Sequence, residues 1–325
     1  MSSNCNVTLC SSANIQTIKQ LIDQLIHTLP ASQTTESKKP IIHLILDGGA
    51  FNGSYLIGAL QFLKEMEKRG YLYVEKISGC SVGSGVGLLY FLDKLDLSYY
   101  LHVIGVNSIR KTGKLGFVKD YKKFILGSFK TETSEQINET ILTAVNNRLY
   151  ISYHDLSIKE TKQYQSYYKT VDELFETIIK SCFIPYLIDH QLCYQSRFID
   201  GITPYIFPFE KNKKIIYLNL CSTDKVRYMF HIKNETTDFH RILTGLLEMH
   251  TFMLKGIRTA MCSYITDWTW KLWSIHYWIK LLMEMFFIFV LKKVYKNDHF
   301  FLCNNNIVGF MAPNIMNQLI YYLTN

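Results

Sequence analysis

Short apolar runs followed by helical patterns mark the first part of the chain. Residues 41–46 are apolar except for one histidine and predict a buried parallel strand, which leads through the glycine-rich stretch 47–53 into a helix that ends at Gly70. Residues 71–78 are rich in aromatic and β-branched side chains and predict a second strand, followed by a helix from Val82. Two consecutive strand–helix units predict parallel strands whose strand-to-helix loops lie at the same edge of one sheet.

Further elements follow the same patterns downstream. Alternating or apolar runs predict strands at 149–154, 162–170, 192–200 and 214–221. After a polar start over residues 1–12, helical spacing predicts an amphipathic helix at 14–29, and residues 31–40 predict a polar linker. Further helices are predicted at 97–106, 120–126, 134–146, 171–182 and 241–255. This order predicts an α/β fold with one core domain and peripheral helices.

An aromatic stretch near the C-terminus has a pattern of its own. Residues 268–294 hold all four tryptophans and an apolar run that Lys280 and Glu284 interrupt, followed by Lys292 and Lys293. Because the uninterrupted part is shorter than the ~20 residues of a spanning helix, the pattern favours a helix lying in a membrane interface. A buried core helix or a dimer helix fits almost as well, and a membrane-spanning helix is the third interpretation.

Composition and charge narrow the class of protein. The chain has 325 residues, of which 48% are hydrophobic and 19% charged, so it can bury a large core and is not disordered. Lysines at 111–123 and 292–296 contribute to a net charge of +8, and these clusters suit contact with an anionic membrane surface better than with nucleic acid. The alternative is that each lysine cluster is an ordinary solvated loop. The eight cysteines lack metal-ligand spacing and predict reduced thiols without a metal site. No secretory signal is evident, so the expected protein is cytoplasmic, and no cofactor is expected.

The strongest candidate chemistry lies where the second strand turns into its helix, at Gly79-Cys80-Ser81-Val82-Gly83. A serine on such a turn has the pattern of a GxSxG nucleophile elbow, in which glycines stand where a Cβ would collide. The N-terminus of the following helix adds free N–H groups and a positive dipole end, which favour a nearby oxyanion. Ser81 is therefore the candidate nucleophile, and an ordinary glycine-rich turn is the alternative.

Two other segments carry candidate chemistry. The loop Asp-Gly-Gly-Ala-Phe-Asn-Gly at 47–53 exposes consecutive N–H groups that can hold a phosphate or the oxyanion of a tetrahedral intermediate. It lacks the Lys-Ser/Thr ending of a P-loop and the full dinucleotide pattern. Further on, the strand 192–200 delivers Asp200 to its end and Gly201 permits a sharp exit, although Asp-Gly is also a common plain turn.

A DGG loop, a GxSxG elbow and a later Asp-Gly, in this order, resemble the patatin-like phospholipase family. The resemblance covers about 41–220 and includes a serine-containing, proline-terminated block at 180–186. It implies a three-layer α/β/α fold with a mainly parallel central sheet. Carried over residue by residue, it implies Ser81 as the nucleophile, Asp200 as the proton acceptor, and an oxyanion hole made of the backbone N–H groups of Gly48, Gly49 and Ala50.

Three positions depart from the family pattern. Ala50 stands where the family has a third glycine, Asn52 where it has Arg or Lys, and Ile202 where it has Gly or Ala. An alanine still offers its N–H, whereas the change at Asn52 removes a charge that could orient the loop or a head group. These departures bear on rate and substrate preference more than on the type of reaction.

The resemblance implies a lipid acyl hydrolase of the phospholipase A type, which cleaves carboxylic esters of membrane lipids through a Ser-Asp dyad and a covalent acyl-enzyme. The phospholipase domain is expected at 41–222, between an N-terminal helix and linker at 1–40 and a C-terminal helical region at 223–325. The expected partners are a phospholipid or other acyl-lipid and an anionic membrane surface, without nucleic acid. The expected location is the cytoplasm, peripheral on membranes.

Two other functions fit the same residues. One is an α/β-hydrolase esterase with a Ser-Asp-His triad, whose histidine would be one of those after Asp200, namely His231, His240, His250, His276 and His299. The other is a protein of the same fold that binds lipid or membranes with little or no catalysis. The hydrolase is preferred because both proposed reactive side chains are present.

Overall fold

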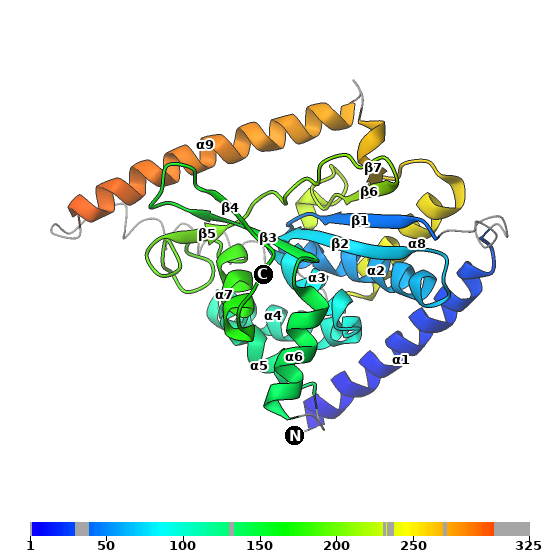
Figure 1. The fold of residues 1–325 in the computed structure, drawn as a ribbon. Coiled ribbons are helices and arrows are strands. Elements are labelled where there is room, and N and C mark those ends of the chain that lie inside the picture. Colours follow the sequence, from blue (N-terminus) through cyan, green and yellow to red (C-terminus); the bar gives the residue numbers. More distant parts are fainter. Residues whose placement is uncertain are drawn as a thin grey trace.

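A seven-stranded sheet forms the centre of the part of the chain that the computed structural model describes, which is residues 2–29, 39–129, 133–229, 232, 237–268 and 272–301 (Figure 1). The strands follow the order β4-β3-β2-β1-β6-β7, and β5 also pairs with β3. Their bounds are β1 (Ile41–Leu46), β2 (Tyr73–Cys80), β3 (Leu149–Asp155), β4 (Lys162–Gln165), β5 (Phe198–Asp200), β6 (Lys213–Leu218) and β7 (Cys262–Tyr264).

The central strands β3, β2, β1 and β6 run parallel to one another, while β4, β5 and β7 pair antiparallel with their neighbours. In β1, Leu44, Ile45 and Leu46 expose no surface, as expected for a parallel strand covered on both faces. The predicted α/β fold with a mainly parallel central sheet is therefore confirmed.

Helices cover the two faces of this sheet unequally (Figure 1). The main core lies between one face and α2 (Gly53–Lys68), α3 (Val82–Phe91) and α8 (Phe239–Lys255), with α1 (Ser2–Ile26) outside them. The long helix α9 (Leu272–Phe301) crosses the other face. The remaining helices are α4 (Ser98–Thr112), α5 (Tyr121–Leu126), α6 (Ser134–Val145) and α7 (Val171–Ser181).

The helices α2 and α8 pack with their backbones in contact. An added Cβ on Gly58 would lie 1.8 Å from the carbonyl oxygen of Ile242, and one on Gly245 would lie 1.9 Å from that of Tyr55. Because a clash with backbone cannot be relieved by a side-chain rotation, only glycine fits at these two positions. The helix α8 therefore fixes α2, which begins directly after the glycine-rich loop.

Some elements differ from those predicted. The first helix begins at Ser2 rather than at residue 14, since residues 2–13 contain no proline or glycine that would stop it. The strand expected at 192–200 is shortened to β5 because Gln195 and Ser196 have positive φ angles, of 47° and 57°. The strand expected at 162–170 ends at Gln165, and β7 was not predicted because it has only three residues.

Other predictions meet no direct test in the fold. Most of the predicted linker 31–40, namely residues 31–38, lies outside the described residues. The domain boundaries expected at residues 40 and 222 stay predictions. Within the described ranges, no helix combines the length and the hydropathy that crossing a membrane requires.

Candidate active site

Ser81 lies in the turn between β2 and α3 with φ 50° and ψ −131°, a conformation that residues with a Cβ rarely adopt. A Cβ added to Gly79 would lie 2.5 Å from the carbonyl oxygen of Gly83. A Cβ added to Gly83 would lie 2.6 Å from a carbonyl oxygen of β1. Two hydroxyls fix the turn: the Ser81 N–H donates to Ser181 Oγ (2.9 Å), and Ser84 Oγ donates to the Ser81 carbonyl (2.6 Å). This is the strand-to-helix geometry of a nucleophile elbow.

Strand pairing places Asp200 next to this elbow. Cys80, the last residue of β2, pairs with Ser152 of β3, and Asp200, the last residue of β5, pairs with the following residue, Tyr153. Since β4 pairs along the opposite edge of β3, β2 and β5 share one edge and meet end to end. The residue after β2 is Ser81, so the two candidate catalytic residues lie at the junction of these strands.

The loop after Asp200 is held closely. An added Cβ on Gly201 would lie 2.2 Å from a carbonyl oxygen of β3, so this residue must be glycine. The N–H groups of Asp200 and Gly201 donate to the carbonyls of Phe183 (2.9 Å) and Ser181 (3.2 Å). The next residue, Ile202, has a φ of 57° and donates its N–H to Asp200 Oδ1 (2.7 Å). The block at 180–186 thus holds both the elbow and the aspartate loop.

Burial raises the pKa of the Asp200 carboxyl to about 6, although the Ser81 hydroxyl, the Ile202 N–H and the charge of Lys162 all act to lower it. Asp200 Oδ2 is buried and has no hydrogen-bond partner among the described residues. The Ser81 hydroxyl thus lies near enough to act on the pKa of Asp200, but it makes no hydrogen bond to Oδ2. A carboxylate with a pKa near 6 is ionised at neutral pH and is a stronger base than an exposed aspartate.

The glycine-rich loop passes beside Ser81, since an added Cβ on Gly48 would lie 3.1 Å from Ser81 Cβ. The Gly48 N–H already donates to Asp47 Oδ1 (3.0 Å). Among the hydrogen bonds of the described residues, none has the N–H of Gly49 or Ala50 as donor. Ala50 has a φ of 45°, which is unusual for alanine. Of the three amides predicted for an oxyanion hole, those of Gly49 and Ala50 are therefore available in this structure.

A buried arginine contacts Asn52, the position at which the family pattern has Arg or Lys. Asn52 is fully buried, and its Nδ2 donates to the carbonyls of Leu220 (3.2 Å) and Lys225 (2.8 Å). Its Oδ1 accepts from Nη1 of Arg241, a fully buried residue of α8 (2.8 Å). The loop therefore keeps a neighbouring positive charge, which a distant helix supplies. The sequence could not show this, because the two residues are far apart along the chain.

An apolar pocket extends from Ser81 between the helices below the sheet. Its cavity volume is ≈ 150 Å³. It reaches from the glycine-rich loop and the elbow to side chains of α2, α3, α4, α5 and α7 and of the short helical turn Gly116–Asp120, including Ile57, Val86, Leu89, Leu101, Phe117, Tyr121 and Ile178. Pockets lined in this way take hydrocarbon groups, so the arrangement suits an acyl chain.

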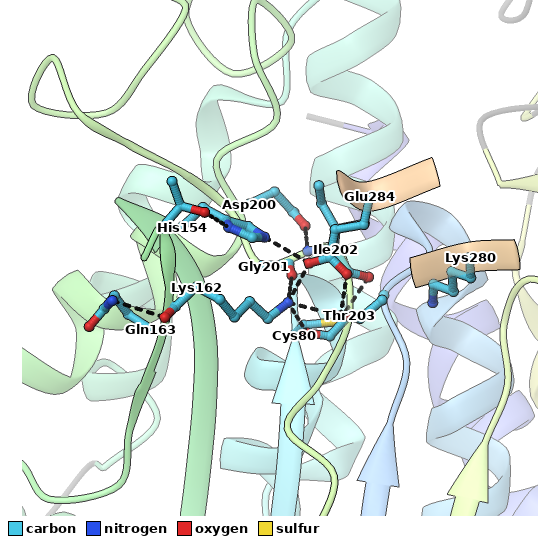
Figure 2. A network of polar contacts seen from close by, with 12 residues as sticks. Cys80, His154, Lys162, Gln163, Asp200, Gly201, Ile202, Thr203, Lys280 and Glu284 are labelled. Carbon is cyan, nitrogen blue, oxygen red and sulfur yellow. Dashed lines mark hydrogen bonds and ion pairs between the residues drawn. The ribbon is translucent and has the colours of Figure 1, made fainter. Parts of the chain in front are cut away.

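A polar cluster that sequence reasoning missed lies behind the aspartate loop (Figure 2). Glu284 of α9 is 6% exposed and contacts Lys162 of β4, His154 of β3 and Thr203. The available signal was the interruption of the apolar run by Lys280 and Glu284, which are four residues apart and so share one face of a helix.

Of the histidines proposed for a triad, the structure describes the side chains of two, and neither makes a hydrogen bond or ion pair with Asp200 among the described residues. His250 contacts Thr28 and the ring of Phe62, and His240 is exposed on α8. His231 and the side chains of His276 and His299 lie outside the described residues. The charged groups that act on the pKa of Asp200 are Lys162 and Glu284.

The mixed α/β fold has a serine at a strand–helix elbow beside a loop in which the amides of Gly49 and Ala50 make no hydrogen bond among the described residues, an arrangement also found in α/β serine hydrolases. Residues 44–104 match the family described as patatin-like phospholipase, which confirms the predicted resemblance to that family over this segment. The match supports a lipid hydrolase, acting on lipid substrates, at the level of the family.

Among solved structures, the chain is similar to VipD from Legionella pneumophila, with 13% sequence identity and a TM-score of 0.30. That alignment covers 54% of this chain and 49% of the other, so the chain spans about half the length of VipD. A comparison with curated proteins gives no match.

Proposed function

We propose that this protein is a phospholipase A-type acyl hydrolase in which Ser81 is the nucleophile and Asp200 the proton acceptor. The observation that carries the proposal is the meeting of β2 and β5 on one edge of β3, which brings the elbow serine to a buried carboxyl group. The raised pKa of Asp200, about 6, supports its role because a base is most effective when its pKa approaches the working pH.

The reaction follows from these positions. Asp200 takes the proton of the Ser81 hydroxyl as Oγ attacks the ester carbonyl, and the amides of Gly49 and Ala50 bind the oxyanion that forms. Collapse of this intermediate breaks the ester bond, the departing alcohol takes the proton from Asp200, and the acyl group stays on Ser81. Water then attacks the acyl-enzyme and gives a proton to Asp200. Collapse of this second intermediate breaks the bond to Ser81 Oγ, which takes the proton back from Asp200, and the fatty acid is released. Each oxyanion donor contributes about 3–4 kcal/mol to such steps in other hydrolases.

We further propose that α9 contacts an anionic membrane surface. The helix turns a row of large apolar side chains to solvent: Ile275, Trp278, Ile279, Leu282, Met283, Met285, Phe286, Phe287, Phe289 and Val290. Lys292 and Lys293 follow this row, and the whole chain carries a net charge of +8. An exposed apolar face flanked by cations suits the boundary between acyl chains and anionic head groups.

The function is tested with phospholipid vesicles, mass spectrometry of the products, and a fluorophosphonate that labels active serines. The parent protein is expected to release fatty acid and to be labelled, whereas Ser81→Ala does neither. Asp200→Asn is expected to lower the rate at least about 10³-fold, since its loss removes the base. Labelling and hydrolysis that persist in Ser81→Ala would overturn the proposal.

One observation favours lipid binding without efficient catalysis, namely that the Gly48 amide is occupied by Asp47. In that case the parent and Ser81→Ala bind vesicles equally and neither releases fatty acid. A histidine-dependent triad predicts a third result, in which Asp200→Asn stays active and one histidine substitution abolishes hydrolysis.

A further inference from the structure

The two charged residues that interrupt the apolar run of α9 both point inward, toward loops of the candidate site (Figure 2). Lys280 pairs with Asp47, the first residue of the glycine-rich loop, and Glu284 reaches the loop after Asp200. On either side of Glu284, Met283 and Met285 are 68% and 59% exposed. The helix therefore buries Lys280 and Glu284 against the protein beside a few apolar side chains such as Ile288 and Leu291, while most of its large apolar side chains are exposed, which is unusual for a surface helix.

Lys280 compensates a carboxylate that has no other cation beside it among the described residues. Asp47 is completely buried, and its Oδ1 accepts hydrogen bonds from both Gly48 N–H and Lys280 Nζ. Burial lowers the pKa of Lys280, but Asp47 and the other acidic groups around the ammonium together hold that pKa well above its ordinary value. A buried carboxylate left without its cation is strongly destabilised. Lys280 thus holds the group that orients the first peptide of the glycine-rich loop.

Glu284 acts at the other loop through Lys162 and Thr203. Its Oε1 accepts from Lys162 Nζ (2.5 Å), and its Oε2 accepts from Thr203 Oγ1 (2.5 Å). Lys162 Nζ also donates to the carbonyls of Gly201 (2.5 Å) and Thr203 (2.7 Å). Although burial favours the neutral acid, hydrogen bonds from His154 and Lys162 and the charge of Lys162 hold the pKa of Glu284 below its ordinary value. This network surrounds the residues that follow Asp200.

We propose that Lys280 and Glu284 are positioning residues, through which α9 holds the glycine-rich loop and the aspartate loop in register around Ser81. The proposal rests on the hydrolase function proposed above and adds a part of the site that lies outside the segment matched by the family. One helix spans both loops, so a small displacement of α9 moves the oxyanion amides and the base together. Displacements of about 1 Å in a catalytic site lower rates by up to about 10²-fold.

The test compares steady-state constants on a water-soluble ester, so that membrane binding does not enter. Lys280→Met is expected to lower kcat by about 10- to 100-fold while KM changes less than about threefold, because the apolar pocket remains. Lys213→Met is the control for removing a paired lysine: its side chain is 19% exposed, against 18% for Lys280, and pairs with the partly exposed Glu75 and Glu210 at the opposite end of the sheet. This control is expected to keep the kcat of the parent.

A double variant separates positioning from loss of the lysine itself. In Asp47→Asn with Lys280→Met, the amide oxygen still accepts the Gly48 N–H while the unpaired buried charge is gone. We expect it to regain most of the kcat that Lys280→Met loses. Glu284→Gln tests the second loop independently and is expected to lower kcat with little effect on KM. A kcat of Lys280→Met equal to that of the control, or a double variant no better than Lys280→Met, overturns the proposal.

Hydrogen exchange gives a readout that does not depend on catalysis. Peptides covering 47–53 are expected to exchange faster in Lys280→Met than in the parent, and those covering 200–203 faster in Glu284→Gln. If the parent neither hydrolyses esters nor reacts with a fluorophosphonate, the hydrolase function fails while exchange still decides whether α9 holds the loops. Unchanged exchange in both variants contradicts the positioning role, even in an active enzyme.

Discussion

Cys80 and Asp200 pair with consecutive residues of β3, one from a parallel neighbour and the other from an antiparallel one. The two strands that carry them run toward each other along one edge and end at the same place. Because both ends are fixed by backbone hydrogen bonds to β3, the positions of the serine and the carboxyl group are set by the sheet rather than by flexible loops. A dyad needs such placement, since it has no third group to orient the base.

The pH dependence of hydrolysis should report Asp200. The carboxyl must be ionised to accept a proton, and burial raises its pKa to about 6. We expect kcat/KM to be constant well above pH 6 and to fall about tenfold per pH unit well below it. A profile on a soluble ester measures this; a fall centred near pH 4 would contradict the raised pKa.

The raised pKa of Asp200 should also make the stability of the protein depend on pH, in the direction opposite to activity: stability falls as the carboxyl ionises. A carboxyl whose pKa is raised on folding stabilises the protein below its unfolded pKa, near 3.8, and this contribution is lost as the pH rises through about 6. Asp200→Asn has no such loss, and its amide oxygen can still accept the Ile202 N–H. We therefore expect it to be more stable than the parent at pH 7–8, by up to about 3 kcal/mol, and to lose this advantage near pH 4. Denaturant unfolding at the two pH values tests this.

Gly201 should tolerate no side chain. A Cβ there would lie 2.2 Å from the carbonyl oxygen of Ser152 and would push the aspartate loop away from the junction of β2 and β5. We expect Gly201→Ala to lower the free energy of unfolding by about 2 kcal/mol or more and to lower activity further than stability alone explains. Gly116→Ala is the control, because its nearest neighbouring atom would be 3.7 Å away. Equal thermal unfolding of the two variants would argue against this contact.

The outer face of α9 should bind membranes. Replacing Trp278, Phe286 and Phe289, which are 63%, 70% and 57% exposed, by serine removes apolar area that the proposal places in lipid. We expect binding to anionic vesicles to weaken at least about tenfold, as seen by sedimentation. Phe209→Ser, at a side chain 71% exposed outside α9, should bind like the parent. Equal loss in both variants would mean that general hydrophobicity, and not this face, drives binding.

Local patterns were enough to predict the first two strand–helix units. The run 41–46, the glycines of the loop and the pentapeptide around Ser81 act on their immediate neighbours, so periodicity and glycine positions predict strand, turn and helix there. The short β5 was harder, because its antiparallel pairing with β3 depends on residues about 45 positions away along the chain. The end of a strand at Asp200 was predicted, but not its direction relative to β2.

By itself the sequence determined the α/β class, the elbow and the order of the three candidate segments, since these follow from short-range periodicity and from glycine. Only the tertiary structure decided that the Gly48 amide is engaged, that Arg241 lies beside Asn52, and that Lys280 and Glu284 of α9 point toward the protein. The physical reason is that a charged group can be buried only where a partner compensates it, and that partner can lie anywhere along the chain. Lys280 and Asp47 are 233 residues apart, so no local pattern contains both.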